Sequence, residues 1–473
     1  MSTWKTVFRL EWRILKQDRA AMGVLALFAG FLVLASLAGG NHARQMAKGL
    51  ERSETEEVQR LTTLAQKLAK LETTQKPLSA RDPRNAVWMG QEGAARLAVL
   101  PPAPLASVAM GQRDFRPQAV RVTSALNLIL ERETETPMAG PTRLQTGAFD
   151  PAFLFVVLFP LVIIALSYEL LSGERERGTL AMLLSQPVSQ GAFVLGKALA
   201  RLTALSGLTL VFAFLGLLIA GGSFFQREES FHFLLYAGVL VGWATFWFAT
   251  AILVNSRGGS SAKNALVLVG IWLVVVVVVP GLVNVGVDTF YPPPSRIELL
   301  HEAREAARDI QKELNNLEGR HDVDPKAGDG ARKIIRVQDE LVKRSEPVLK
   351  ELNEKLQERQ TILSALRFLS PAILVQLSLE DVAGSGSIRH ARFEKQADSF
   401  HREFRAFFSE RVQSGLEMRT KDLRQLPSFE FKEEPTKALA ARTAVSVGAL
   451  LLLSMLLGLG ARPGLEKVGR LTG

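Results

Sequence analysis

The sequence predicts an all-α, polytopic membrane protein with six transmembrane helices and two helical extracytoplasmic inserts that form one outer domain. Apolar residues make up 47% of the 473 residues, and they are gathered in clusters long enough to cross a bilayer. Two long polar segments with helical spacing of their apolar residues interrupt these clusters. Basic residues are concentrated in the segments on one side of the predicted membrane. Together these observations define the predicted fold class.

The six apolar clusters are predicted to be transmembrane helices, because a helix needs about 20 residues to span the hydrocarbon layer. Charged side chains are missing from the interiors of these clusters. Ion-coupled transporters usually place a carboxylate or a base at membrane depth, so this absence argues against a secondary antiporter. It permits a lipophilic or bulky substrate, or no substrate. The predicted spans are 20–38, 149–168, 198–220, 231–254, 265–285 and 438–460.

An even number of spans places both termini, including the 461–473 tail, on one side of the membrane. That side carries 14 basic and 6 acidic residues, a net charge of +8 out of the chain's formal +10. By the positive-inside rule this side is cytoplasmic, which predicts a multi-pass membrane protein with both termini in the cytoplasm. The membrane accounts for the basic charge, so no nucleic-acid partner is expected.

Residues 1–19 are predicted to form an amphipathic helix in the inner membrane interface, in contact with lipid. Trp4 and Phe8 accompany Lys5 and Arg9 in a pattern that is typical of a helix on a membrane surface. A secretory signal is the alternative, since residues 35–38 resemble a small-residue cleavage site. The basic region is longer than that of a typical signal, which favours the interfacial helix.

The first extracytoplasmic insert, 39–148, is predicted to contain a helix that begins at a capping box formed by Ser53 and Glu56. Leucines follow at 3-4-3 spacing, which indicates a coiled-coil-like seam. From 77 to 117 the insert is rich in Pro, Gly and Ala, which favours extended or loop structure. A further helix is predicted for 119–130. The leucines of the seam are Leu61, Leu64, Leu68 and Leu71.

The second extracytoplasmic insert, 286–437, is predicted to be strongly helical. A heptad seam after a capping box at Ser295, a turn at 320–330 and a second long helix to about 369 indicate an antiparallel hairpin that reaches away from the membrane. An aromatic stripe at helical spacing follows. Packing against neighbouring helices explains this stripe better than a hydrophobic ligand does. The stripe consists of Phe393, Ala397, Phe400, Phe404 and Phe407.

A charged segment, the inner loop (169–197), connects the second and third spans. The charges at 174–177 are followed by an amphipathic run and a break at Pro187. This pattern is typical of a short helix along the membrane surface with a polar face free for a partner. The alternative is that the charges only solvate a connection between two spans.

Gly191, Gly196 and Lys197 spell G-x-x-x-x-G-K, the beginning of a phosphate-binding loop, but their context excludes one. Ala198 stands where a Ser or Thr hydroxyl would hold magnesium, and no strand precedes the glycines. The sequence contains no other such loop. We therefore expect no cofactor to be bound by this chain, and the energy source must be another polypeptide.

The order E-R-E-x-G-T-L-x-x-L-L-x-x-P-V-S in the inner loop, followed by Gly196-Lys197, resembles the first cytoplasmic loop of type-2 ABC exporter permeases. The resemblance implies that the loop carries a coupling helix that docks on an ABC ATPase subunit, which binds ATP and Mg. It also implies that two permease subunits, identical or paralogous, pair above two ATPase subunits. The residues implied in the ATPase contact are Glu174, Arg175, Glu176, Arg177, Gly178, Thr179, Leu183, Pro187 and Lys197.

The end of the second insert resembles a subgroup of these permeases that carries large extracytoplasmic helical inserts. The resemblance rests on the order S-P-A, A-G-S-G-x-x-R-H and phenylalanines that begins at Ser370. Typical permeases have only a small outer loop after the first span, so the 39–148 insert departs from them and agrees with the subgroup. This departure weakens any transfer of substrate from other exporters.

No catalytic site is recognisable in the sequence, so a non-catalytic membrane subunit is expected. The chain has no cysteine, which excludes disulfides and thiolate metal sites. A metal site would need ligands that converge with fixed geometry, and solvated or packing side chains are the favoured interpretation of the histidines. The residues considered are His390, His401 and the cluster His321, Asp322 and Asp324.

The resemblance leads to two hypotheses on function. The first is the transmembrane (permease) subunit of an ATP-driven ABC exporter, which couples ATP hydrolysis in a separate subunit to substrate movement across the membrane. The second is an ABC-type mechanotransmission subunit, which drives a periplasmic partner without transporting cargo. A third and less favoured hypothesis, an ATP-independent receptor scaffold, would not depend on the inner-loop charges.

Overall fold

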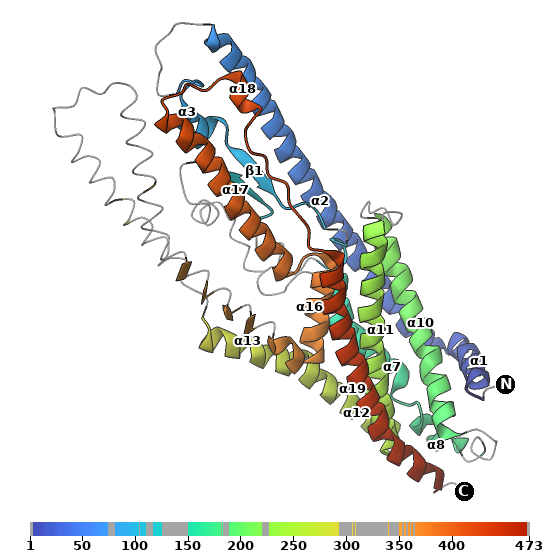
Figure 1. Cartoon of the computed structure of the whole chain (residues 1–473). Helices are drawn as coiled ribbons and strands as arrows, with labels where there is room; N and C mark the ends of the chain where they lie inside the picture. The colour runs from blue at the N-terminus through green and yellow to red at the C-terminus, as the bar shows by residue number, and fades with distance from the viewer. Residues whose placement is uncertain are drawn as a thin grey trace.

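The computed structural model shows a bundle of long helices that continues at one end into an outer domain, while both termini lie at the other end (Figure 1). It describes residues 3–73, 81–103, 105–109, 117–124, 150–180, 182, 189–219, 227–292 and 365–470, together with 305, 308, 339, 350, 351, 354, 355, 358, 359, 361 and 362.

The described chain is mostly helical, and six of its helices are long and apolar enough to cross a membrane, which confirms the predicted fold class. The six lie at Arg19–Glu72, Pro151–Glu176, Gln190–Leu218, Glu229–Ser256, Ser261–Phe290 and Thr436–Lys467.

The elements follow one another along the chain, and within the residues that the structure describes they include three π-helical segments (η1, η3, η4) and one 3-10 segment (η5). They are α1 (Thr3–Gln17), α2 (Arg19–Glu72), α3 (Ala86–Trp88), η1 (Met89–Gly93), β1 (Arg96–Val99), β2 (Ala119–Val122), α6 (Pro151–Phe153), η3 (Leu154–Leu158), α7 (Phe159–Ser167), α8 (Ser172–Glu176), α10 (Gln190–Ile219), α11 (Arg227–Ser256), α12 (Ser261–Trp272), η4 (Leu273–Val278), α13 (Val279–Phe290), η5 (Arg367–Leu369), α16 (Pro371–Ala383), α17 (Ser387–Gln413), α18 (Thr420–Leu423) and α19 (Thr436–Arg470).

Helix α2 passes from the bundle into the outer domain without a break. The carboxylate of Asp18 caps its start by accepting from the backbone N–H groups of Ala20 and Ala21 at 2.9 and 3.2 Å. The helix has 54 residues and is about 80 Å long. The predicted helix start at Ser53 is wrong, because its hydroxyl donates to the carbonyl of Gly49 inside the continuous helix at 3.1 Å. No proline interrupts α2, so nothing in it forces a break.

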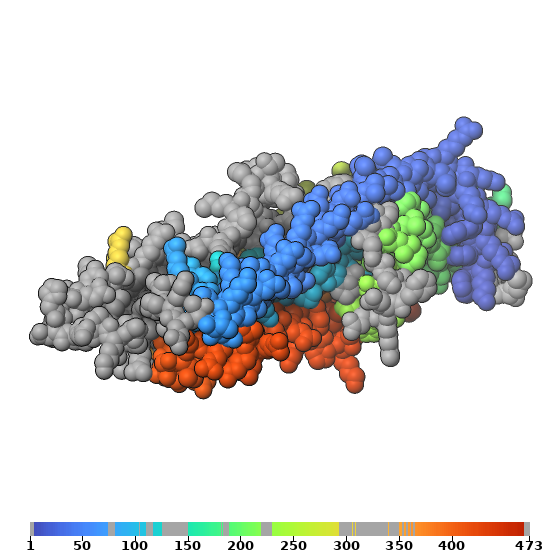
Figure 2. Space-filling view, turned by 90° about the horizontal axis from the view of Figure 1, so that it is seen from above, coloured from blue at the N-terminus to red at the C-terminus, as the bar shows by residue number. Residues whose placement is uncertain are grey.

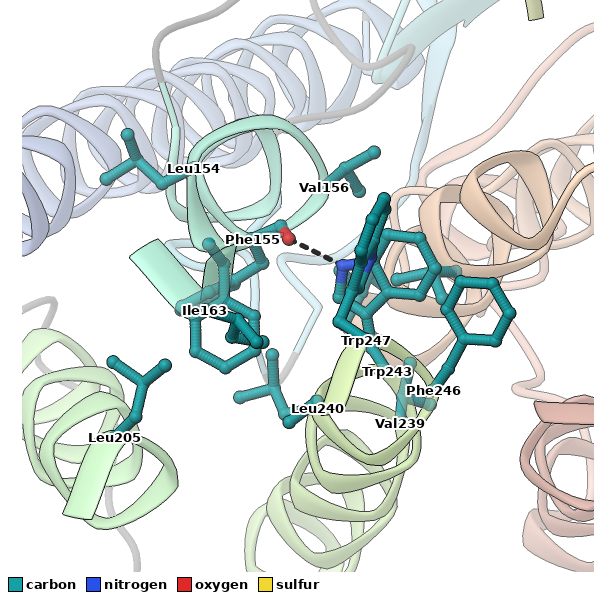
Figure 3. Packing of buried hydrophobic residues seen from close by; sticks show 14 of the residues in the cluster. Leu154, Phe155, Val156, Ile163, Leu205, Val239, Leu240, Trp243, Phe246 and Trp247 are labelled. Atoms are coloured by element: carbon teal, nitrogen blue, oxygen red, sulfur yellow. Dashed lines mark hydrogen bonds between the residues drawn. The ribbon is translucent and has the colours of Figure 1, made fainter. Parts of the chain in front are cut away.

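Helix α11 lies at the centre of the bundle. It packs against α7, α10, α12, α16 and α19, and Tyr236, Trp243 and Trp247 on it are fully buried. The Trp243 ring stacks on Phe246, and its indole N–H donates to the carbonyl of Phe155 at 2.9 Å (Figure 3). Large flat side chains thus fill the space between α11 and the second span.

Helices α12 and α13 lie at the edge of the bundle. In the most apolar stretch of the fifth span, Ser261–Phe290, only 11% of the residues are buried. In that of the fourth span, Glu229–Ser256, 67% are buried. Leu266, Leu282 and Val285 are among the exposed apolar side chains of this edge. Such a continuous apolar face is suited to lipid or to another membrane helix.

The two inserts share one apolar core in the outer domain. Leu64 and Leu68 of α2 and Val120 of β2 contribute from the first insert, whereas Phe393 and Phe404 of α17 contribute from the second. Figure 2 shows α2 running beside α17 over this part of the molecule. In the described residues, therefore, the two inserts fold as one unit. The aromatic stripe lies in this core, which agrees with the packing interpretation.

A two-stranded antiparallel sheet replaces part of the helix predicted for 119–130. Strands β1 and β2 pair with Arg96 opposite Val122 and Val99 opposite Ala119. Val120 and Val122 are buried while Arg121 is exposed, so the side chains alternate with the period of a strand. The helical prediction failed because this short alternation was not recognised. Residues 125–130 lie outside the described residues, as does most of the hairpin predicted for the second insert.

Replacing Phe404 by alanine is expected to lower the free energy of unfolding of the outer domain by about 3–5 kcal/mol, because the change leaves a cavity in the shared core. Phe404 is fully buried and contacts the rings of Phe400 and Phe408. Thermal unfolding in detergent measures the loss. Leu416→Ala is the control, since Leu416 is exposed in the same domain and its truncation should change little. Equal effects of the two substitutions would contradict the prediction.

Candidate functional site

A short helix, α8, lies in the first part of the inner loop and forms the last turn of the second candidate span, Pro151–Glu176. The chain reverses at Gly178, whose φ of +73° is a left-handed conformation that glycine adopts readily. Two of the nine residues predicted for this site, Leu183 and Pro187, lie outside the described residues. The other seven can be placed.

Glu174 connects α8 to the beginning of α10 through hydrogen bonds of its carboxylate. Its carboxylate accepts a hydrogen bond from Lys197 Nζ at 2.7 Å and another from the hydroxyl of Thr179. Arg177 lies 3.4 Å from the same carboxylate. Lys197 is itself buried and lies over the Phe193 ring, 5.0 Å from its centroid. The Glu174–Lys197 pair is therefore an internal connection between α8 and α10, the helix of the third span.

Glu176 connects α8 to the beginning of α12 through hydrogen bonds of its carboxylate. Its carboxylate accepts from the backbone N–H of Ser261 at 2.7 Å and from the Ser261 hydroxyl at 2.8 Å. A carboxylate at the first turn of a helix is favourable, because it neutralises free N–H groups and the positive end of the helix dipole. Arg175 donates to the carbonyl of Gly259 at 2.5 Å and strengthens the same connection.

A third connection, between α1 and α10, involves residues that were not predicted. Glu11 is only 2% exposed, and its carboxylate accepts from Arg201 at 2.6 Å, with Lys197 Nζ 4.0 Å away. Arg201 also donates to the carbonyl of Leu166 at the end of the second span. The signal available in the sequence was an acidic residue, Glu11, in the middle of the basic, amphipathic segment 1–19.

Glycine at position 196 allows α1 to lie directly on α10. A Cβ there would come within 2.9 Å of the Trp4 carbonyl and 2.8 Å of the Val7 side chain. Any larger residue would separate the two helices and move Lys197 away from Glu11 and Glu174. The glycine thus positions the charged cluster.

The seven described residues have different roles. Glu174, Arg175, Glu176, Thr179 and Lys197 form hydrogen bonds within the chain, and Gly178 forms the turn. Arg177 lies 3.4 Å from Glu174 but remains 58% exposed. Met182, which was not predicted, is 71% exposed. Both exposed side chains are accessible to a partner. Contact of the predicted residues with an ATPase stays a prediction.

The histidines considered as metal ligands are placed in part. His390 and His401 are buried on α17, and His390 lies 3.2 Å from Glu394 of the same helix. In the described part of the chain, no group of three or more His, Cys, Asp or Glu side chains is arranged to hold a metal ion. The cluster around His321 lies outside the described residues.

A second buried acidic site lies on α16, which is not one of the six candidate spans. Burial raises the pKa of Glu380 to about 7, although a hydrogen bond from Gln376 at 2.7 Å opposes this shift. The neighbouring carboxylates of Asp150 and Asp381 raise the pKa further. Beside them, two hydrogen bonds from Arg442 hold the pKa of Glu434 below its usual value.

Replacing Glu380 by glutamine is expected to stabilise the protein at pH 8 and to change little at pH 4. The pKa of Glu380 is higher in the folded state, so its favourable contribution is complete below pH 4.5 and is lost as the pH rises through about 7. Ionising the buried carboxyl then costs about 3 kcal/mol, which a neutral amide avoids. Thermal unfolding at the two pH values measures the difference. An equal shift at both would contradict the assignment to this carboxyl.

Six candidate spans and a charged loop fastened to two of them define a multi-pass membrane subunit. The profile of the family described as "ABC-2 family transporter protein" matches residues 5–461, so the chain belongs to the ABC-2 transporter family. It is an ABC-2 type permease subunit. Such subunits are non-catalytic and generally pair with ATPase subunits, which bind the nucleotide.

One relative is a "Probable ABC transporter permease protein NosY" of Stutzerimonas stutzeri. It is 28% identical to this chain over 144 residues, which are 29% of this chain and 51% of that protein. The chain thus spans about half the length of this curated relative.

Proposed function

We propose that this chain is the permease subunit of an ATP-driven exporter in the bacterial cytoplasmic membrane, with both termini in the cytoplasm. It pairs with a second permease subunit, identical or paralogous, above two ABC ATPase subunits. The inner loop is the docking site for the ATPase, and ATP and Mg are bound by that partner. The observation that carries this proposal is the fastening of α8 to two different spans, through Glu174 to Lys197 and through Glu176 to Ser261.

This geometry converts a push on the inner loop into a movement of helices. The exposed Arg177 and Met182 receive the ATPase, and the two carboxylates pass the displacement to α10 and α12. Charge-assisted hydrogen bonds are stronger and shorter than neutral ones, so these connections resist separation under load. The spans then tilt and open a path outward for the substrate.

A second candidate function, force transmission to a periplasmic partner, is favoured by one observation. Helix α2 continues unbroken from the membrane bundle into the outer domain, where Leu64 and Leu68 pack in the core that the two inserts share. A displacement of the first span would therefore move the outer domain as a lever. In this mode the complex does work on a partner and moves no cargo.

Reconstitution with the partner ATPase in lipid vesicles separates the two functions. An exporter shows ATP-dependent flux that the transported compound stimulates. A force transmitter shows no flux, and its ATPase rate depends on an extracytoplasmic partner. A chain that co-purifies with no ATPase in mild detergent, and whose inner loop is labelled from outside intact cells, would contradict both.

A further inference from the structure

The second and fifth spans contain the same local irregularity. In each, a π-helical segment, η3 or η4, ends shortly before a proline, Pro160 or Pro280. The residue before each proline donates five residues back: Phe159 to the carbonyl of Leu154, and Val279 to that of Val274. Segments of this kind are rare and are frequent at functional sites.

The next carbonyl in each segment has no backbone donor in this register. Phe155 and Val275 would require the N–H groups of residues 160 and 280, and proline has none. A carbonyl without a partner inside the hydrocarbon layer is costly, because no water replaces the missing donor. The two spans therefore each need a donor from elsewhere.

A side chain of another element supplies each donor. Trp243 of α11 donates to the carbonyl of Phe155 at 2.9 Å (Figure 3), and the Ser370 hydroxyl donates to the carbonyl of Val275 at 2.9 Å. Ser370 also caps α16, since its oxygen accepts from the backbone N–H of Ala372 at 3.2 Å. A buried serine thus joins the bend of the fifth span to the first turn of α16.

Ser370 begins α16, whose buried side chains belong to the core of the membrane bundle. From it, α16 continues through the left-handed Gly384 into α17, which carries the phenylalanines of the outer-domain core. At its other end, the fifth span is held to the inner loop by Glu176 and Ser261. The continuous helix formed by α12 and η4 therefore contacts the inner loop at one end and the first turn of α16 at the other.

We propose that Ser370 is a positioning residue that transmits bending of the fifth span to the outer domain through its hydrogen bond to the Val275 carbonyl. This inference rests on the proposed function, since the bend is driven from the inner loop. Trp243 holds the corresponding bend of the second span to the central helix α11.

Distance measurements between paired spin labels test the proposal on the complex with its ATPase in lipid. The chain has no cysteine, so labels can be placed without a background. An inner pair at Lys16 and Lys467 reports on the bundle, and an outer pair at Val285 and Lys395 reports on α17 against the fifth span; all four sites are exposed. In the wild type, trapping with ATP is expected to shift both distances.

In Ser370→Ala, the ATP-induced change of the inner-pair distance is expected to persist, and that of the outer-pair distance to fall at least about twofold. Ser370→Thr retains a hydroxyl and is expected to restore the outer change. An outer shift that persists in Ser370→Ala, or that Ser370→Thr fails to restore, overturns the inference and leaves the proposed function standing. An inner distance that does not respond to ATP in the wild type overturns the proposed function, and this inference with it.

A double-mutant cycle with Pro280→Ala tests the bond itself, even where Ser370→Ala impairs function by misfolding. Alanine at 280 supplies the missing N–H to Val275. Ser370→Ala should then lower the thermal midpoint much less in the Pro280→Ala background than in the wild type. Equal losses in both backgrounds would show that the hydroxyl does not replace the missing proline donor, and would overturn the inference.

Discussion

Reversing both carboxylates of the inner loop, Glu174→Lys with Glu176→Lys, is expected to lower ATP-dependent activity of the complex at least about tenfold, the range of ordinary coupling free energies. Lysine at 174 would face the buried Lys197, and lysine at 176 would face the positive end of α12. Both attractive contacts of α8, with α10 and with α12, would then become repulsive. Basal ATP hydrolysis by the partner should persist, because its active site is untouched. Flux, or partner-stimulated ATPase activity, is the measurement.

Two further variants separate loss of coupling from loss of fold. Glu466→Lys reverses an exposed charge near the same end of the bundle and should leave activity unchanged. Combining Glu174→Lys with Lys197→Glu restores opposite charges at 2.7 Å contact and should recover part of the activity. Full activity in the double reversal would instead favour a receptor scaffold that does not use the ATPase.

The membrane bundle was predictable from the sequence because each spanning helix forms its backbone hydrogen bonds within itself and contains a long apolar run. The structure has six such helices within the described residues, at the places where the apolar clusters lie. The turn at Gly178 and the charges around it are likewise local features of the sequence, whereas the contact of this loop with an ATPase stays a prediction.

Long-range pairings could not be predicted in the same way. The contact of Glu11 with Arg201 joins residues 190 positions apart, and only the packing of α1 on Gly196 brings them together. The outer-domain core likewise combines Leu68 of the predicted coiled-coil-like seam with Phe404 of the aromatic stripe, which the sequence did not connect. Periodicity shows that a face is apolar but does not show which other face covers it.

The π-helical segments were missed for a different reason. The sequence shows Pro160 and Pro280, and the carbonyl that each leaves without a donor follows from the missing N–H of proline. What the sequence does not show is the donor, because Trp243 and Ser370 belong to distant elements. The contacts that the sequence does not predict are thus those between one helix and another. Transmission of force depends on these same contacts.

Replacing Glu11 by alanine is expected to destabilise the protein by about 3–5 kcal/mol, the cost of removing one partner from a buried ion pair. The carboxylate is 2% exposed and accepts from both Nε and a terminal nitrogen of Arg201, at 2.9 and 2.6 Å. Without it, Arg201 keeps only the Leu166 carbonyl, and Lys197 keeps only Glu174 as a carboxylate partner within 4.0 Å among the described residues. Thermal unfolding in detergent measures the loss.

Glu11→Gln should cost much less than Glu11→Ala, because the amide oxygen still accepts from Arg201 although the charge is gone. Arg13→Ala, an exposed change on the same helix, serves as the control and should change little. The order of the three variants tests the structure: if Arg13→Ala were as harmful as Glu11→Ala, α1 would be held by its basic face on lipid and not by the buried carboxylate. In that case a push on the inner loop would not be carried to α1 through Lys197 and Glu11.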